Sequence, residues 1–129
     1  MTLRSRALQM AAGRAGIGVM SIATPSLSAK IVGYPAAHDN PTARMMARLF
    51  GVRELLLAYL VIDAVRGPDG PSPSVFAVQA AVDASDIIVQ SWPLIKREGL
   101  DRAAVGGIAL AGVAALAWAR LAREAAAQA

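Results

Sequence analysis

Long apolar segments alternate along the chain with short segments rich in Pro, Gly, Asn and Asp. The longest uncharged segment covers residues 103–119, which just reaches the lower limit of about 17 residues for a helix that crosses a bilayer. Trp118 and Arg120 at its end form the aromatic and basic pair typical of a spanning helix at the headgroup region. This pattern predicts a small integral membrane protein.

Helix breakers divide the rest of the sequence into similar segments. No segment shows the period-two alternation of a strand, and no internal repeat is visible. Because the connections are short, consecutive helices are expected to be antiparallel neighbours, with both termini on one side. We therefore predict an all-α fold, a single antiparallel four-helix transmembrane bundle in the cell membrane. Its helices are predicted at about residues 3–28, 41–65, 73–91 and 102–125.

Particular residues mark the predicted helix ends. Pro25 is expected to kink or end the first helix. Asn40 followed by Pro41 is a typical N-cap and first residue for the second helix. Pro93 is expected to stop or kink the third helix, and Asp101 is predicted as the N-cap of the fourth.

The composition agrees with a membrane location. Of the 129 residues, 56% are hydrophobic and 17% are charged, against roughly 45–50% and 25% in soluble domains. The net charge is +4, but the basic residues flank apolar segments instead of forming one patch. This placement favours anchoring beside lipid headgroups over nucleic-acid binding. Membrane lipids are the expected partners, together with a homo-oligomer or a larger membrane complex, and a soluble Ala-rich helical bundle is the alternative.

The sequence offers little conventional catalytic or metal chemistry. It has no cysteine, so disulfides, thiolate nucleophiles and Cys-ligated metals are excluded. His38 has no second His or Cys and is expected to be solvated in a polar loop. No phosphate-binding loop or cofactor motif is present. We predict neither a metal nor a cofactor, and whether the chain is an enzyme stays open.

The N-terminal segment allows a second interpretation, in which it is a cleaved signal peptide. Arg4, Arg6 and Arg14 would then form its basic region and residues 15–23 its apolar region. Residues 26–28 would supply the small side chains of a cleavage site. The mature chain would keep three helices.

A polar stripe runs along the predicted third helix. Gln79, Asp83, Asp86 and Gln90 follow one another at spacings of four, three and four residues, so they share one face of a helix. In water this stripe would face solvent. In lipid it must face the bundle interior, because a charge at the centre of a spanning helix costs roughly 2.5–3.5 kcal/mol.

The first and second predicted helices offer complementary groups. Arg14 lies among glycines in the first helix, and Arg53 and Glu54 are adjacent in the second. Glu54 shares a face with small residues that favour close helix packing. Arg53 is predicted to pair with a carboxylate of the third helix and not only with Glu54, since adjacent helical residues point about 100° apart.

These residues allow a structural or a functional interpretation. They could only fix helix register and pairing, or form a proton relay, an ion path or a pocket for a polar headgroup. The leading hypothesis is a non-enzymatic accessory protein that binds a ligand or partner. The alternative is a small membrane enzyme that uses Asp83 and Asp86 as acid and base. The candidate residues for the interior polar site are Asp83, Asp86, Gln79, Gln90, Arg14, Arg53 and Glu54.

Three segments together resemble a known group of proteins. They are Gly13-Arg14 with Gly18 and Pro25, the element Arg48-Leu-Phe-Gly-Val-Arg-Glu-Leu55, and Val82-Asp-Ala-Ser-Asp86. These segments resemble small bacterial, actinobacterial-type four-helix membrane proteins of unknown function, which are loosely similar to DoxX-like proteins. The resemblance implies a membrane bundle in which Arg53, Asp83 and Asp86 are important. It implies no activity.

Overall fold

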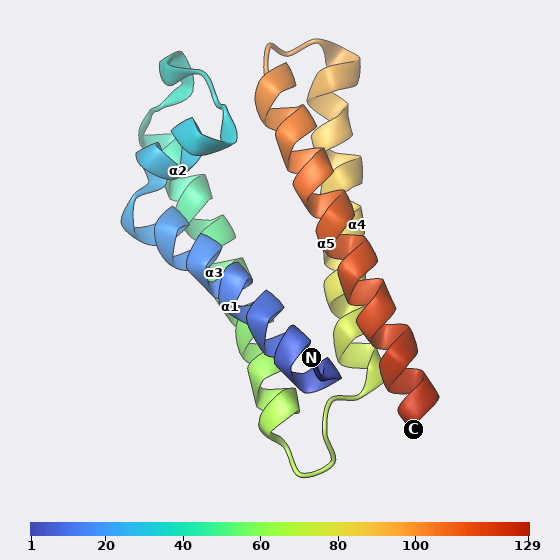
Figure 1. Cartoon of the computed structure of the whole chain (residues 1–129). Helices are drawn as coiled ribbons and strands as arrows, with labels where there is room; N and C mark the ends of the chain where they lie inside the picture. The colour runs from blue at the N-terminus through green and yellow to red at the C-terminus, as the bar shows by residue number, and fades with distance from the viewer.

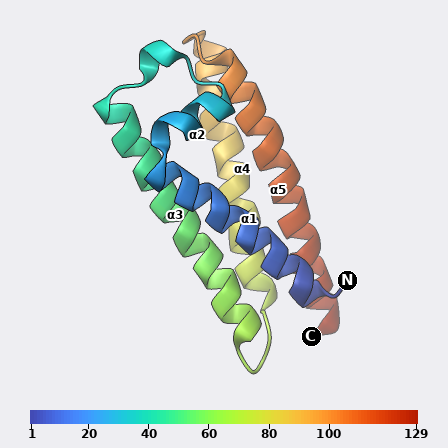
Figure 2. The same ribbon diagram turned by 60° about the vertical axis from the view of Figure 1, so that its left-hand side comes forward.

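The computed structural model describes residues 1–129, and every regular element in it is helical (Figure 1). The all-α prediction is confirmed, with five α-helices in place of the four expected. Both termini lie at the same end of the molecule (Figures 1 and 2). The elements are α1 (Leu3–Ala23), α2 (Pro25–Val32), the 3-10 helix η1 (Ala36–His38), α3 (Pro41–Arg66), α4 (Pro73–Lys96) and α5 (Asp101–Gln128).

The additional helix arises because the predicted helix 3–28 is broken at Thr24. Thr24 leaves the helical conformation, with φ −133° and ψ 63°, and Pro25 begins α2 as its first residue. The Thr24 N–H and hydroxyl both donate to the Met20 carbonyl, at 2.8 and 3.0 Å, and so satisfy the end of α1. Pro25 therefore ends the helix, as one of the two predicted outcomes, and a new helix follows directly.

Of the two predicted N-caps, one is confirmed and one is wrong. Asn40 caps α3, because its side-chain oxygen accepts a bond from the Ala43 N–H at 2.9 Å. The prediction for Asp101 is wrong by one residue. Leu100 occupies the capping position of α5 without a side-chain bond, and Asp101 is the first helical residue. As the first residue of α5, Asp101 still lies where the helix dipole stabilises a carboxylate.

Pro93 does not end α4, which continues to Lys96. A proline this close to the end of a helix removes only one main-chain hydrogen bond, so the last turn can still form. The helix ends instead at Arg97, whose φ of 54° turns the chain into the left-handed region. The predicted end at residue 91 is therefore wrong.

The four long helices pack as two hairpins, α1 with α3 and α4 with α5 (Figures 1 and 2). In the first hairpin the backbones touch at two glycines. A Cβ on Gly18 would lie 2.8 Å from the Gly51 carbonyl oxygen, and a Cβ on Gly51 would lie 2.6 Å from the Gly18 carbonyl oxygen. Such close approach is typical of helices that associate through small residues.

The two hairpins meet at the end that carries the termini, where the hydrophobic core lies. Phe76 and Trp118 stack at its centre, with ring centroids 6.1 Å apart. Trp118 is 1% exposed, so its predicted position at a membrane surface is wrong; its ring fills the space between the hairpins. Trp92, beneath the Lys96 ammonium, is an exposed aromatic residue near the end of α4. The core residues are Ala7, Ala11, Ala58, Val61, Val65, Phe76, Trp118, Leu121 and Ala125.

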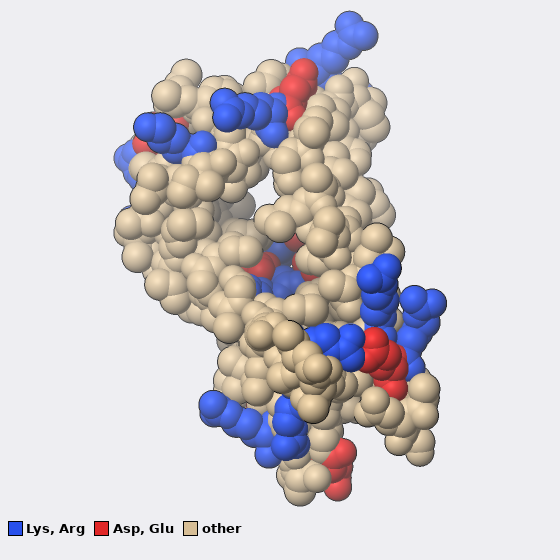
Figure 3. Space-filling view, viewed as in Figure 1, with Lys and Arg blue, Asp and Glu red and all other residues tan.

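At the opposite end the hairpins diverge and leave an opening between them, which we call the window (Figure 3). Acidic and basic atoms are visible inside the molecule at its lower edge. Its upper end is closed where α2 reaches α5. There the Arg102 side chain crosses Gly33, and a Cβ on Gly33 would lie 2.9 Å from it. Gly33 also has φ +107°, so both its conformation and its surroundings favour glycine.

Other polar contacts hold the loops and termini. Asp39, in the loop after η1, accepts bonds from the Ser26 hydroxyl at 3.1 Å and the Arg44 guanidinium at 2.9 Å. These two donors hold the pKa of Asp39 below its usual value. Arg6 and Glu124 pair at the other end and connect the two terminal helices. His38 is exposed, as predicted.

Substitution of Gly51 by Ala is expected to destabilise the first hairpin by about 1–3 kcal/mol, because the added methyl group would overlap the backbone of α1. The matched control is Gly16→Ala, since Gly16 lies in α1 with nothing within 4 Å of an added Cβ. That change should stabilise by about 0.5–1 kcal/mol. Thermal unfolding followed by circular dichroism measures both effects. Equal effects of the two substitutions would contradict the close packing.

Candidate functional site

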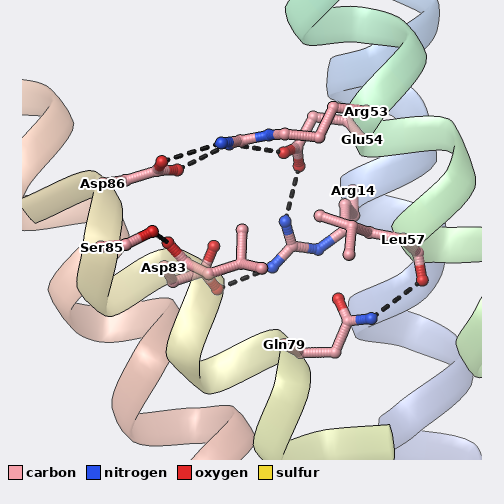
Figure 4. A network of polar contacts seen from close by, with 9 residues as sticks. Arg14, Arg53, Glu54, Leu57, Gln79, Asp83, Ser85 and Asp86 are labelled. Atoms are coloured by element: carbon pink, nitrogen blue, oxygen red, sulfur yellow. Dashed lines mark hydrogen bonds and ion pairs between the residues drawn. The ribbon is translucent and has the colours of Figure 1, made fainter. Parts of the chain in front are cut away.

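Five charged side chains from three helices form one connected cluster, which we call the ionic network (Figure 4). Arg14 of α1 lies at its centre. Its guanidinium donates to Glu54 Oε2 of α3 at 2.8 Å and to Asp83 Oδ2 of α4 at 2.7 Å. The network therefore joins the two hairpins. Its members are Arg14, Arg53, Glu54, Asp83 and Asp86.

The three central members are almost fully enclosed. Arg14 is 6% exposed, Glu54 4% and Asp83 5%. A buried charge is tolerated only when opposite charges and hydrogen bonds compensate for the lost hydration. The short, direct contacts of Arg14 with both carboxylates provide this compensation.

Arg53 forms the second half of the network. It holds Asp86 through two parallel bonds, at 2.9 and 2.6 Å, so the predicted pairing with a carboxylate of the next long helix is confirmed. Arg53 also reaches its neighbour Glu54 at 3.0 Å. Its guanidinium lies 4.9 Å from the Phe50 ring centre, and 38% of its side chain is exposed. Arg53 is therefore the member of the network nearest to the surroundings.

Glu54 connects the two arginines, because each of its oxygens accepts from a different guanidinium. Helical spacing produces this arrangement. Glu54 belongs to the face of α3 that also carries Gly51 and Ala58, where α1 approaches closely. The small neighbours allow the longer Arg14 side chain to reach across to α4.

Gln79 lies one turn before Asp83 and is completely buried. Its amide nitrogen donates to the main-chain carbonyl of Leu57 at 3.0 Å, which is a further link between α4 and α3. Its amide oxygen has no hydrogen-bond partner. In Figure 4 this side chain lies directly below Arg14 and faces the network.

Gln90 does not join the network, although the helical spacing predicted the same face. Its amide donates to the Asp86 carbonyl of its own helix at 3.1 Å and packs on Gly107 of α5, where an added Cβ would overlap it. The hairpins diverge above Asp86, so α3 presents no partner at this height. The amide turns to the neighbouring helix of its own hairpin instead.

Trp118 is the residue of this region that the sequence interpretation missed. Its ring lies 5.8 Å from the Arg14 guanidinium carbon, within the range of a cation–π contact. Ala111, Leu121 and Ala125 are buried on the same helix. Their spacing of three and seven residues from Trp118 is a helical core pattern, and it could have indicated that this tryptophan faces inward.

The arginines and carboxylates of the network stabilise one another as buried charges. The network offers no nucleophile with an adjacent base. Each carboxylate is bonded to at least one guanidinium. No family model, curated protein or solved structure matches the chain. The resemblance to small DoxX-like membrane proteins accordingly stays a prediction.

Removal of the central cation is expected to be strongly destabilising. Arg14→Met leaves Glu54 without its second partner and Asp83 without any, both in a buried site. Breaking a buried pair in this way typically costs about 3–5 kcal/mol. The unfolding free energy of the purified variant, compared with that of the parent chain, measures the loss.

Arg44→Met provides the comparison, because Arg44 also pairs with an aspartate but its side chain is 36% exposed. Exposed pairs contribute about 0–1 kcal/mol. A loss after Arg14→Met no greater than that after Arg44→Met would show that the interior network contributes nothing to holding the fold.

Proposed function

We propose that this chain is a multi-pass integral membrane protein whose four long helices, α1, α3, α4 and α5, cross the bilayer as an antiparallel bundle. We propose further that it has a non-enzymatic role, in which it binds a small polar or lipid-like ligand, or a partner subunit, at the window. The observation that carries the membrane assignment is an inversion of polarity. Charged side chains lie inside the bundle, and large apolar side chains lie outside.

The exposed apolar side chains are distributed over all four long helices. Soluble proteins rarely expose large apolar side chains on every long helix, and they seldom bury ionised groups. In a protein that spans a bilayer, apolar side chains face outward and charged side chains face inward, because a charge is costly in the hydrocarbon. Representative exposed residues are Val19 of α1, Leu56 and Leu60 of α3, Ile88 and Val89 of α4, and Val113 and Leu116 of α5.

Helix length and the distribution of charge support the same assignment. The four helices have 21, 26, 24 and 28 residues, and about 20 are needed to cross a bilayer. One of them, α5, is by length and composition apolar enough to do so. The other three contain the network residues or basic ends, which lower their hydropathy. In Figure 3 the surface charges lie at the upper end of the molecule and over its lower half, and the surface around the window is uncharged apart from the network.

The two alternatives fit the geometry less well. A soluble bundle would have its polar stripe in water, whereas Asp83 is enclosed between the hairpins. An enzyme that uses Asp83 and Asp86 as acid and base would need both groups to reach a substrate. Each of them is instead held by an arginine, Asp83 by Arg14 and Asp86 by Arg53. Binding of a ligand at the window does not require Asp83 or Asp86 to leave its arginine.

The window is the place where we expect a ligand. It adjoins the ionic network, and Arg53, whose side chain is 38% exposed, is the most exposed member of that network. A partly exposed guanidinium favours an anionic group such as a lipid phosphate or a carboxylate. The exposed apolar side chains around it are suited to acyl chains or to the helices of another membrane subunit.

A substitution on the outer face of α5 separates the membrane assignment from a soluble bundle. Val113 is 69% exposed at the middle of the uncharged segment. Val113→Asp should oppose membrane insertion by roughly 2.5–3.5 kcal/mol, whereas the same change on a wet surface is nearly neutral. Val113→Leu is the control and should have no effect. The fraction of protein that resists carbonate extraction measures insertion, and a parent chain recovered without detergent would contradict the assignment.

The binding role predicts that an anionic amphiphile copurifies with the protein in mild detergent. Native mass spectrometry should detect it on the parent chain. Arg53→Gln should weaken its binding about tenfold or more, which corresponds to a loss of about 1.4 kcal/mol. Arg44→Gln, at an exposed arginine far from the network, should retain it. Equal retention by both variants would remove Arg53 from the binding site.

A further inference from the structure

We propose that Asp83 is a proton-binding site at the centre of the bundle, and that the bound proton weakens the Arg14–Asp83 link between the two hairpins. The inference rests on the proposed membrane location, since lipid around the window would further limit the access of bulk water to a carboxylate that the hairpins already enclose. The proposed ligand is a proton, and it binds the carboxyl group of Asp83.

The charges of the interior do not balance. Arg14 of α1 and Arg53 of α3 face three carboxylates, which are Glu54 of α3 and Asp83 and Asp86 of α4. The remaining packed helix, α5, presents Trp118 and contains no charged residue in segment 103–119. One negative charge is therefore uncompensated, and a single positive charge would neutralise the site.

Hydrogen bonding distinguishes Asp83 from the other two carboxylates. Asp86 accepts two bonds from Arg53, and Glu54 accepts one from each arginine. Asp83 accepts only one, at Oδ2. The fully buried Gln79 oxygen, one turn away on the same face of α4, is also without a donor. A proton on Asp83 supplies an O–H donor to a site that has acceptors to spare.

A metal ion suits this site less than a proton does. Hard cations such as Ca²⁺ take about six to eight oxygen ligands. The site leaves two acceptor oxygens without a donor: Asp83 Oδ1, since Asp83 accepts only at Oδ2, and the buried Oε1 of neighbouring Gln79. The proton needs only the single carboxylate oxygen to which it binds.

Proton binding at Asp83 has a mechanical consequence. The bond between Arg14 and Asp83 is the most buried ion pair that joins the first hairpin to the second. When Asp83 is neutral, this bond loses one of its charges. The Arg53–Asp86 pair and the bond from the Gln79 side chain to α3 then hold the hairpins without it, so separation at the window costs less free energy. The coupling is reciprocal. Separation removes Arg14 from Asp83 and leaves the carboxyl in an apolar setting, which favours the protonated form.

Spin-label distances across the window test this inference. The chain has no cysteine, so Leu49→Cys on α3 and Ile88→Cys on α4 place two labels on exposed positions of different hairpins, above the network. In nanodiscs, the mean distance should lengthen between about pH 8 and about pH 5. The shift should exceed the roughly 1 Å typical of rigid partners. Labels at Val19 and Leu49, both in the first hairpin, should show no shift.

The variant Asp83→Asn carries a neutral group permanently and should show the longer distance at both pH values. Asp69→Asn, in the exposed loop between α3 and α4, should keep the parental response. A distance that does not change with pH, or a response that survives in Asp83→Asn, would overturn the proposal. Protein that fails to enter the nanodisc contradicts the membrane assignment instead, so the two failures are distinguishable.

Infrared spectroscopy provides a second readout that does not require Asp83→Asn to fold. The parent chain at the lower pH should show the carbonyl band of a protonated carboxylic acid in an apolar setting. Asp83→Glu keeps a titratable group and should shift this band. A band that is absent, or that is the same in both proteins, would overturn the assignment to Asp83.

Discussion

The assembly of this molecule depends on one guanidinium, that of Arg14, held between Glu54 of its own hairpin and Asp83 of the other. None of these three groups could be buried alone, because desolvation of an isolated charge costs far more than a folded chain can offset. Their burial is possible only when all three are at the same height. The contact therefore selects one register of the two hairpins, even where it adds little net stability.

Packing is graded along the helices around this contact. On the side of the termini, Phe76 and Trp118 fill the space between four helices. On the other side the hairpins are joined by the Arg53–Asp86 pair and where α2 meets α5, at Gly33 and Arg102. Regions with few buried apolar contacts open at lower free energy than the core. The end that contains the window is therefore the more deformable end of the bundle.

The helices and much of the network followed from the sequence because they depend on local rules. Pro25 and Asn40 mark helix ends, and a spacing of four and three residues places Gln79, Asp83 and Asp86 on one face. Two errors are local, because Pro93 stands inside α4 and Asp101 lies one residue beyond the cap of α5. The larger misjudged features depend on tertiary packing. The inward position of Trp118 and the turn of Gln90 towards α5 are set by how far apart the hairpins lie at each height. The residue pattern of a single helix does not predict this distance between the hairpins.

The division of charge between the hairpins has a consequence for biogenesis. The first hairpin carries Arg14 and Arg53 against Glu54 and is left with a positive charge, whereas the second carries Asp83 and Asp86 with no internal cation. In a membrane, the hairpin translated first can shelter most of its own charge, but the later one is mismatched with lipid until it docks. In the proposed membrane arrangement, the second hairpin therefore leaves two carboxylates without their arginine partners until it docks. Docking of the hairpins and neutralisation of these carboxylates are then a single step.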